Sequence, residues 1–376
     1  MQNPASTARI VHCADYGGPY AGSFVSMLVA AAKAARQRDY ETTICFSERA
    51  RGRSWLRELD GLAEIRFVER SGIRGDLHQF RQILAEAGGC PTLLHTHFGT
   101  FDETSALLRL QRRRTAVLWH AHSGTTRAIR IRSKVYGAVF GRIVNGIVCV
   151  SPAMYEEVLE RRFPVAKVRL LANAIDLERF GPVDPDERAA ARRSLGLPPS
   201  AKVVLHFAWD WEIKGGDLLL SVADAMVVDP EVMFLTVHAE HGGEVPEAAL
   251  KRRPSVRALA PRGNVNELYA AADAFLNCSR AEGGLPYAVL EALARGLPAV
   301  VTDPPVRGEV VEGLPGGRAV SRQPAAIAAA LSEVLDLTPA QRADHAGAAR
   351  ARVAASYALE PWSRRLVDLY DEALTR

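Results

Sequence analysis

The sequence has few aromatic residues and no long apolar run. Phenylalanine, tryptophan and tyrosine make up 7% of its 376 residues, so we expect an aliphatic core of helices packed on a sheet rather than a β-sandwich. No apolar stretch approaches the roughly 18 residues that would span a bilayer. The N-terminus lacks the charged and then apolar pattern of a secretory signal. We therefore expect a cytoplasmic protein that is at most peripheral to a membrane.

Cysteine and net charge are also scarce. The five cysteines are scattered, odd in number and without CxxC spacing, which argues against a disulfide framework or a zinc site and favours a reducing compartment. The formal net charge is only +4, whereas a dedicated nucleic-acid binder concentrates more positive charge. We therefore expect no nucleic-acid partner.

Short apolar runs alternate with helical patterns, and the alternation occurs twice. Apolar strands separated by helices are typical of parallel sheets that are covered on both faces. The sequence therefore predicts an α/β protein with two Rossmann-like parallel-sheet domains facing across a cleft. The expected strands are 8–13, 41–46, 64–68, 92–95, 115–120 and 146–150 in the first half, and 202–207, 233–238, 274–278 and 299–302 in the second.

The segment 180–200 contains GPVDPDE and LGLPPS, and its proline-rich, charged composition predicts a linker. We therefore predict an acceptor-side domain over 1–180 and a donor domain over 181–358. A C-terminal helix over 359–376 is expected to pack back on the first domain. In open α/β sheets, ligands bind at the carboxyl ends of the strands, so the site is expected there.

The most informative stretch is SRAEGGLPYAVLEALARGLPAVVTD, from Ser279 to Asp303. It follows an apolar strand, turns through two glycines and enters a helix, whose free N-terminal amides suit a diphosphate. Glu282 precedes the turn and Glu291 lies on the apolar helix, where a carboxylate needs a partner. Such a carboxylate can accept hydrogen bonds from a ribose.

This stretch resembles the C-terminal signature of the retaining glycosyltransferases of the GT-B fold, in the large family four. That family carries two glutamates separated by seven residues and then EA-x-A-x-G-x-P. The later part matches at Glu291, Ala292, Ala294, Gly296 and Pro298. Eight residues separate Glu282 from Glu291 here, because the turn has an extra glycine, and we expect the longer turn still to deliver Glu282.

The run VVLHFAWDWEIKGGDLLL is similar to the family's strand–GR–loop–KG–helix element, whose arginine and lysine neutralise the nucleotide diphosphate. Lys214 fits the lysine, but Trp209 stands at the arginine position. Trp209 either stacks on the donor or lines the acceptor site. A diphosphate leaving group bears about two negative charges, so further donors are needed. Those expected are Arg280, Arg307 and the amides of Gly283, Gly284 and Leu285.

Other segments extend the resemblance from about residue 8 to 310. NAID with a following Phe180 resembles the family's NGID-x-x-x-F, and in PRGNVNELYAAAD the resemblance makes Arg262 a contact to the nucleobase. DYGGPYAG resembles the glycine-rich loop after the first strand, where Gly17 and Gly18 would let the backbone approach phosphate or acceptor. His120 ends the strand TAVLWH, where the family often has a histidine facing the donor sugar.

Three histidines near His120 have alternative interpretations. His122 competes with His120 for the place beside the sugar. His95 and His97 have the spacing of a metal pair, but packing and cleft lining explain HTHFG better. Since neither a well-placed DxD motif nor a cluster of histidine and carboxylate is evident, we expect no metal and no cofactor.

The resemblance implies a metal-independent, retaining hexosyltransferase. It would move a sugar from a nucleoside diphosphate sugar, with UDP as the commonest donor nucleotide, to a hydroxyl of a glycan, lipid-linked saccharide or small natural product. Lys214 would stabilise the diphosphate, Glu291 would hold the ribose, and Glu282 would orient the sugar or stabilise positive charge at its anomeric carbon. A nucleotide-sugar 2-epimerase-like enzyme and a non-catalytic nucleotide-sugar binding partner remain open, the second because of Trp209.

Basic residues cluster from Arg109 to Arg114 (RLQRRR) and from Arg127 to Lys134 (RAIRIRSK). A solvated helical face explains them. The alternative is attraction to an anionic acceptor or to an anionic membrane surface, where basic groups act together.

Overall fold

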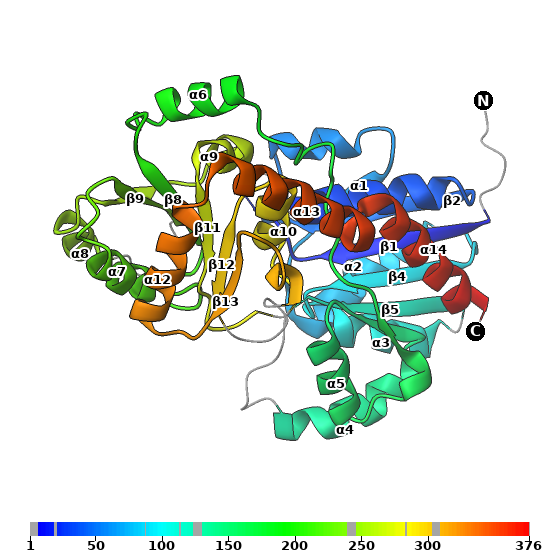
Figure 1. Cartoon of the computed structure of the whole chain (residues 1–376). Coiled ribbons are helices and arrows are strands. Elements are labelled where there is room, and N and C mark those ends of the chain that lie inside the picture. Colours follow the sequence, from blue (N-terminus) through cyan, green and yellow to red (C-terminus); the bar gives the residue numbers. More distant parts are fainter. Residues whose placement is uncertain are drawn as a thin grey trace. The chain divides into compact units, whose positions relative to one another are not determined.

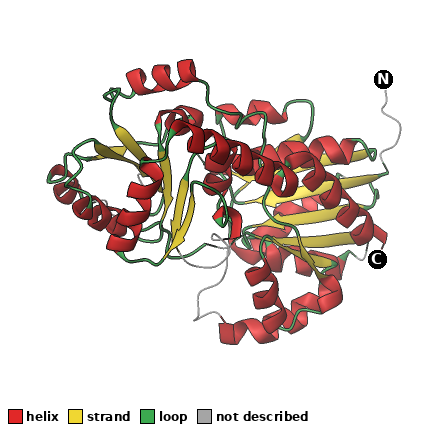
Figure 2. Ribbon diagram, in the orientation of Figure 1, coloured by secondary structure: helices red, strands yellow, loops and turns green. Residues whose placement is uncertain are grey.

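The computed structural model describes residues 7–18, 21–86, 88–112, 114–122, 130–238, 246–282, 284–302 and 309–375, without the side chains of 130–135. Two compact units divide the chain: unit 1 is Met1–Ala174 with Leu359–Arg376, and unit 2 is Ile175–Ala358. Each unit has one parallel sheet flanked by helices (Figures 1 and 2). The predicted class, two parallel-sheet α/β domains, is confirmed.

Unit 1 contains a seven-stranded sheet in the order β3-β2-β1-β4-β5-β6-β7. Its strands are β1 (Ala8–Ala14), β2 (Tyr40–Ser47), β3 (Glu64–Val68), β4 (Thr92–His97), β5 (Thr115–Ala121), β6 (Gly146–Cys149) and β7 (Val168–Leu170). Its helices are α1 (Ser23–Arg36), α2 (Gly72–Ala85), α3 (Asp102–Gln111), α4 (Arg130–Ile143), α5 (Pro152–Glu160) and α14 (Leu359–Thr375). In the part of unit 1 that the structure describes, short 3-10 helices span Glu48–Ala50, Ser54–Leu59 and Val165–Lys167.

The last helix of the chain completes unit 1. α14 packs beside α1 and contacts β4 and β5 (Figure 1), while α2 and α3 pack together, with α3 against β4 and β5. Trp362 and Tyr370 of α14 are buried, and Asn145 donates a hydrogen bond of 2.9 Å to the carbonyl of Ala373. Helix α14 is therefore part of the core of unit 1 rather than an appendage.

Unit 2 contains a six-stranded sheet in the order β10-β9-β8-β11-β12-β13. Its strands are β8 (Lys202–Ala208), β9 (Val232–His238), β10 (Val256–Leu259), β11 (Ala274–Asn277), β12 (Ala299–Thr302) and β13 (Gly317–Val320). Its helices are α6 (Pro185–Ser194), α7 (Gly216–Ala225), α8 (Glu247–Lys251), α9 (Val265–Ala271), α10 (Tyr287–Ala294), α12 (Pro324–Leu335) and α13 (Pro339–Tyr357). Helices α7 and α12 pack together, as do α6 with α9 and α10 with α13.

The segment expected to be a linker is instead a helix of unit 2. Helix α6 lies within 180–200, and the side chain of Asp184 caps it by accepting a hydrogen bond of 2.8 Å from the backbone N–H of Glu187. Pro185 occupies the first turn, where its missing N–H costs nothing. The linker prediction was wrong because the same prolines and charges that suggest a loop also start this helix.

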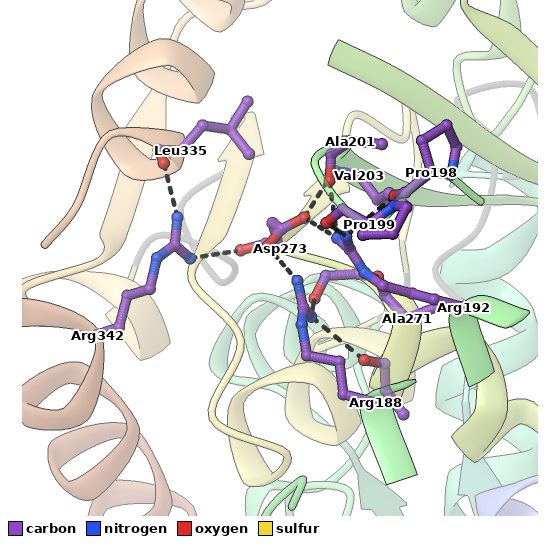
Figure 3. A network of polar contacts seen from close by, with 12 residues as sticks. Arg188, Arg192, Pro198, Pro199, Ala201, Val203, Ala271, Asp273, Leu335 and Arg342 are labelled. Atoms are coloured by element: carbon purple, nitrogen blue, oxygen red, sulfur yellow. Dashed lines mark hydrogen bonds and ion pairs between the residues drawn. The ribbon is translucent and has the colours of Figure 1, made fainter. Parts of the chain in front are cut away.

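A partly buried carboxylate ties α6 to the sheet. Asp273 stands just before β11 and forms ion pairs with Arg188 and Arg192 of α6, the second at 2.6 Å (Figure 3). One oxygen of the same carboxylate accepts a hydrogen bond of 2.8 Å from the backbone N–H of Val203, and Arg342 donates to the carbonyl of Asp273 at 3.0 Å. The network fixes the amino-terminal ends of β8 and β11 to each other.

Candidate functional site

The candidate site lies where the strand order of unit 2 reverses. β8 and β11 are hydrogen-bonded neighbours in the middle of the sheet, yet the chain leaves them toward opposite edges. Loops diverge at such a point and leave a crevice at the carboxyl ends of the strands, which is where open α/β sheets bind ligands. The loop after β8 carries Lys214 and the loop after β11 carries Glu282.

Lys214 is held in place by the backbone around it. The carbonyl of Lys214 lies 3.0 Å from the ring Nε2 of the buried His206. The next residue, Gly215, has a φ of 78° and is the N-cap of α7. A Cβ at Gly215 would lie 2.4 Å from the carbonyl oxygen of Cys278, so only glycine allows the two loops to approach this closely.

The structure brings Lys214 and Glu282 into direct contact. The Nζ of Lys214 lies 2.7 Å from Oε1 of Glu282, and the two side chains are 24% and 13% exposed. The loop after β11 therefore holds the Glu282 carboxylate against Lys214. The contact itself was not anticipated, because sequence analysis gave the two residues separate roles.

Glu291 is almost buried on α10, at 8% exposure. Its Oε2 accepts a hydrogen bond of 2.7 Å from the hydroxyl of Tyr269, on α9. The carboxylate therefore has the polar partner that its burial requires. Tyr269 was not singled out from the sequence, and its place in the apolar run of α9 gave no signal of a polar role.

The turn before α10 is described only in part. Gly284 and Leu285 are buried and lie just before the first turn of the helix, where backbone amides have no partner within the helix. Gly283 lies outside the described residues, as does Arg307. The use of these amides for an anion therefore remains a prediction.

Trp209 lies at the end of β8 in a stack of aromatic rings. Its ring is parallel to that of Phe207 with centroids 5.4 Å apart, and Phe207 in turn contacts Tyr269 at 5.6 Å. Phe207 thus packs against both Trp209 and Tyr269, the hydrogen-bond partner of Glu291. The position of Trp209 suits stacking, but it provides no positive charge in place of the family's arginine.

Two arginines that the sequence analysis assigned to the donor, Arg280 to the diphosphate and Arg262 to the nucleobase, are paired with carboxylates. Arg280 forms a two-pronged ion pair with Asp217 of α7, at 2.5 and 2.7 Å, so its charge is balanced within the fold. Arg262 lies 3.2 Å from Glu267 at the start of α9. Arg280 therefore serves chiefly to join the two loops, and Arg262 stays a predicted contact to the base.

Gly17 and Gly18 follow β1 in unit 1 and pack closely against neighbouring residues. A Cβ at Gly17 would lie 2.6 Å from the Cβ of Arg49, and the carbonyl of Gly18 accepts a hydrogen bond of 2.9 Å from the indole N–H of Trp55. Close packing of the backbone therefore explains the glycine at position 17. Contact of either glycine with a ligand stays a prediction.

His120 lies in a cluster of five histidines, of which four are buried and His122 is partly buried. In the sheet register His12 of β1 is beside His95 of β4, and His97 of β4 is beside His120 of β5. Residues two apart on a strand face the same way, so these four side chains share one face, and His122 lies 4.2 Å from His120 between ring centroids. Burial lowers the pKa of His120 well below its usual value, so it is a neutral ring.

The first basic run, from Arg109 to Arg114, is not wholly a solvated face. Arg109 is committed to the fold, since it donates hydrogen bonds of 2.7 and 2.9 Å to the carbonyls of Ile143 and Thr115. The side chains from Arg127 to Lys134 lie outside the described part of the chain. Among the described residues, no helix combines the length and the apolar character needed to cross a membrane.

The architecture defines the class of protein. HepE of Anabaena, solved with UDP and glucose, superimposes with a TM-score of 0.81 at 17% identity, over 97% of this chain and 99% of that one. Sucrose-phosphate synthase of Thermosynechococcus elongatus superimposes with a TM-score of 0.75 at 19% identity, over 98% and 99%. The fold is that of the GT-B glycosyltransferases, with two doubly wound parallel sheets.

Sequence comparison gives the family. Residues 25–179 match the family described as Glycosyltransferase Family 4, and residues 201–336 match Glycosyl transferases group 1. The chain belongs to this family, glycosyl transferases group 1 or family four. The D-inositol 3-phosphate glycosyltransferase of Thermobispora bispora is 32% identical over 232 residues, which are 57% of this chain. The match spans about half the length of that relative, 52%.

Proposed function

We propose that the protein transfers a hexosyl group, with retention of configuration, from a nucleoside diphosphate sugar to a hydroxyl of a glycan, lipid-linked saccharide or small natural product. The observation that carries this proposal is the pairing of Lys214 with Glu282 across the loops of β8 and β11, at 2.7 Å. Lys214 and Glu282 meet where the strand order reverses, and Glu291 lies on the helix that follows. One cation and two carboxylates suit the diphosphate, the sugar and the ribose of such a donor.

Lys214 would bind the diphosphate. In the ligand-free chain its charge is balanced by Glu282, and a diphosphate entering the crevice would provide a stronger anionic partner. As the bond between the anomeric carbon and the phosphate oxygen breaks, negative charge grows on that oxygen. A fixed cation aimed at growing charge lowers the barrier. The amides before α10 would share this work.

Glu282, once released from Lys214, would face the sugar. Its carboxylate can orient a sugar hydroxyl or stabilise positive charge at the anomeric carbon. Departure and attack would then share one face of the sugar, and the leaving phosphate would take the proton of the acceptor hydroxyl. The products are the glycosylated acceptor and a nucleoside diphosphate.

Glu291 would hold the ribose, as acidic residues do in dinucleotide sites. The hydroxyl of Tyr269 donates to Oε2 and so holds the carboxylate in one orientation. Trp209 would stack on the donor. We propose UDP as the nucleotide, since HepE, which shares the fold, was solved with UDP and with UDP-glucose. A GDP-mannose-dependent relative of Corynebacterium glutamicum, 28% identical over 222 residues, makes GDP the alternative to test.

No Mg²⁺ or Mn²⁺ need bridge the diphosphate in this proposal, because Lys214 and the amides would balance its charge. The expected result is that adding either ion to the chelator-treated protein leaves the rate of donor turnover unchanged. A rate that depends on either ion would contradict this part of the proposal.

The first test is a thermal-shift panel of UDP, GDP, ADP and TDP with their common sugar conjugates. A ligand at one hundred times its dissociation constant stabilises the folded state by about 2.7 kcal/mol. We expect a shift with one nucleotide that is lost in Glu291→Gln and kept in Glu333→Gln, whose native carboxylate pairs with Arg318 on the surface. A panel without any shift would overturn the proposed donor class.

The second test separates transfer from binding alone. Lys214→Met is expected to lower kcat by about 10²–10³-fold, the usual effect of losing one stabilising group for a growing oxyanion. Lys202→Met is the matched control, because Lys202 pairs with Asp229 and Asp336 at the start of β8. Donor binding without turnover would point to a non-catalytic binder, and turnover without a glycosylated acceptor would point to epimerisation or hydrolysis.

A further inference from the structure

The histidine cluster of unit 1 has an ordered arrangement around three of its members. His12, His95 and His97 each offer one ring nitrogen, and these three nitrogens lie within 4.8 Å of one another. Nδ1 of His12 and Nε2 of His97 are 3.0 Å apart. All three rings are buried, at 2% exposure or less. They come from β1 and β4, which adjoin where the strand order of unit 1 reverses.

Each of these rings is held by a partner on its other nitrogen. Nδ1 of His95 lies 2.8 Å from the hydroxyl of Tyr370, which is also 3.5 Å from Nε2 of His12. Nδ1 of His97 lies 3.0 Å from Nε2 of His122. Histidines that bind metal ions are oriented in this manner, through a hydrogen bond on the nitrogen that does not bind.

One of the inward nitrogens lacks a partner. Nε2 of His95 is buried and has no hydrogen bond. A buried polar atom without a partner is costly, so this atom points to a ligand that takes its lone pair. Tyr370 already occupies the other nitrogen of this ring, so Nε2 is the atom that is left for a ligand.

The atoms that the three histidines provide indicate which kind of ion would bind. The three rings provide only nitrogen, and no carboxylate belongs to the group. Imidazole nitrogen suits Zn²⁺, Cu²⁺, Ni²⁺ and Fe²⁺, whereas Mg²⁺ and Ca²⁺ need oxygen.

We propose that His12, His95 and His97 bind one divalent transition-metal ion, through Nδ1 of His12 and Nε2 of the other two. The ion would replace the proton that His12 and His97 share. With Zn–N bonds of about 2.0–2.1 Å, tetrahedral ligand nitrogens lie about 3.3–3.4 Å apart, close to the separation of that pair. Three protein ligands leave a fourth position for water, hydroxide or an anionic group.

The proposal is independent of the donor chemistry of unit 2. The ion joins β1 to β4, near their carboxyl ends, and through Tyr370 it joins both strands to helix α14. Its role is therefore to fix the loops that leave these strands.

The test uses the full chain without a polyhistidine tag, dialysed against a chelator and titrated with ZnCl₂ by calorimetry. Titration with CoCl₂ reports the ligand geometry by visible absorption. We expect saturation at one ion per chain, and a loss of affinity of at least about 100-fold in His95→Gln, which removes the unpartnered ligand. His78→Gln, on the exposed face of α2, and His120→Gln, in the same cluster but outside the three, are matched controls and should bind as the parent does.

Tyr370→Phe keeps every ligand and removes only the hydroxyl that orients two rings. Its affinity should fall by about 10–100-fold, as for other partners of metal-binding histidines. Circular dichroism of each metal-free variant checks folding, and His12→Gln replaces His95→Gln if the latter does not fold. Absence of saturable binding, binding that survives His95→Gln, or loss in His120→Gln equal to that in His95→Gln would overturn the proposal.

Discussion

Replacing Asp273 by alanine should strongly destabilise unit 2. The substitution removes the counter-charge of Arg188 and Arg192 and also the acceptor of the Val203 N–H (Figure 3). The side chain of Asp273 is only 17% exposed and that of Arg192 only 9%. Removing one partner of a buried ion pair costs about 3–5 kcal/mol, because the other charge is left buried.

The comparison variant is Asp336→Ala. Asp336 is also an aspartate of unit 2 in an ion pair, with Lys202 at 3.0 Å, but its side chain is 67% exposed. Exposed pairs contribute about 0–1 kcal/mol. In a unit of this size 1 kcal/mol shifts the melting temperature by about 2–4 °C, so Asp273→Ala should lower it by roughly 6–20 °C and Asp336→Ala by less than about 4 °C.

Urea and thermal unfolding followed by circular dichroism give these differences. Hydrogen exchange of peptides from β8 and β11 identifies the unit that is affected. Equal, small losses in both variants would refute the argument, since they would mean that the network around Asp273 contributes no more than a surface pair does. Asp273→Asn, which keeps an oxygen for the Val203 N–H, should fall between the other two.

Two further predictions concern the hydrogen bond of Tyr269 and the burial of two histidines. Tyr269→Phe removes the hydrogen bond to Glu291, which contributes about 0.5–1.5 kcal/mol, or more when a charge is involved. Calorimetry should therefore show that the affinity for the nucleotide is lowered about 3- to 10-fold. Unchanged affinity would mean that Glu291 does not bind the nucleotide. In the metal-free chain, burial lowers the pKa of His12 and of His122 to about 3, below the value of about 6.5 in the unfolded chain. Because the unfolded chain then binds more protons, the free energy of unfolding should fall as the pH drops from about 6.5 toward 3, by up to about 1.4 kcal/mol per pH unit for each ring. Urea midpoints that do not change between pH 7 and pH 5 would contradict this.

The central strands and the edge strand β3 could be predicted from the sequence, but the edge strands β7, β10 and β13 could not. The buried runs of β1, β4, β8 and β11 are continuous and apolar, which marks strands covered on both faces. By contrast β7, β10 and β13 are three or four residues long and mostly not buried. They are defined by pairing with a neighbour, which leaves no apolar run in the sequence.

The sequence identified the residues of the candidate site but not the contacts between them. Glu291 stands out because a charge on an apolar helix needs a partner, whereas Lys214 and Glu282 stand out through the motifs that resemble the family. Their partners depend on how two loops meet, and that is set by Gly215 and the turn before α10. The histidine cluster shows the same limit: His95 and His97 were noticed as neighbours in the chain, whereas His12 joins them only through the register of β1 with β4.

Unit 1 is discontinuous in the chain, and this constrains the order in which the protein can fold during synthesis. Its helix α14 follows the whole of unit 2, yet Leu366 and Tyr370 are fully buried in the core of unit 1. Domains usually fold from the N-terminus as the chain emerges. Here the first 174 residues cannot complete their core until unit 2 has been synthesised, because α14 is missing from one face of their sheet. The second unit can therefore reach its native state before the first.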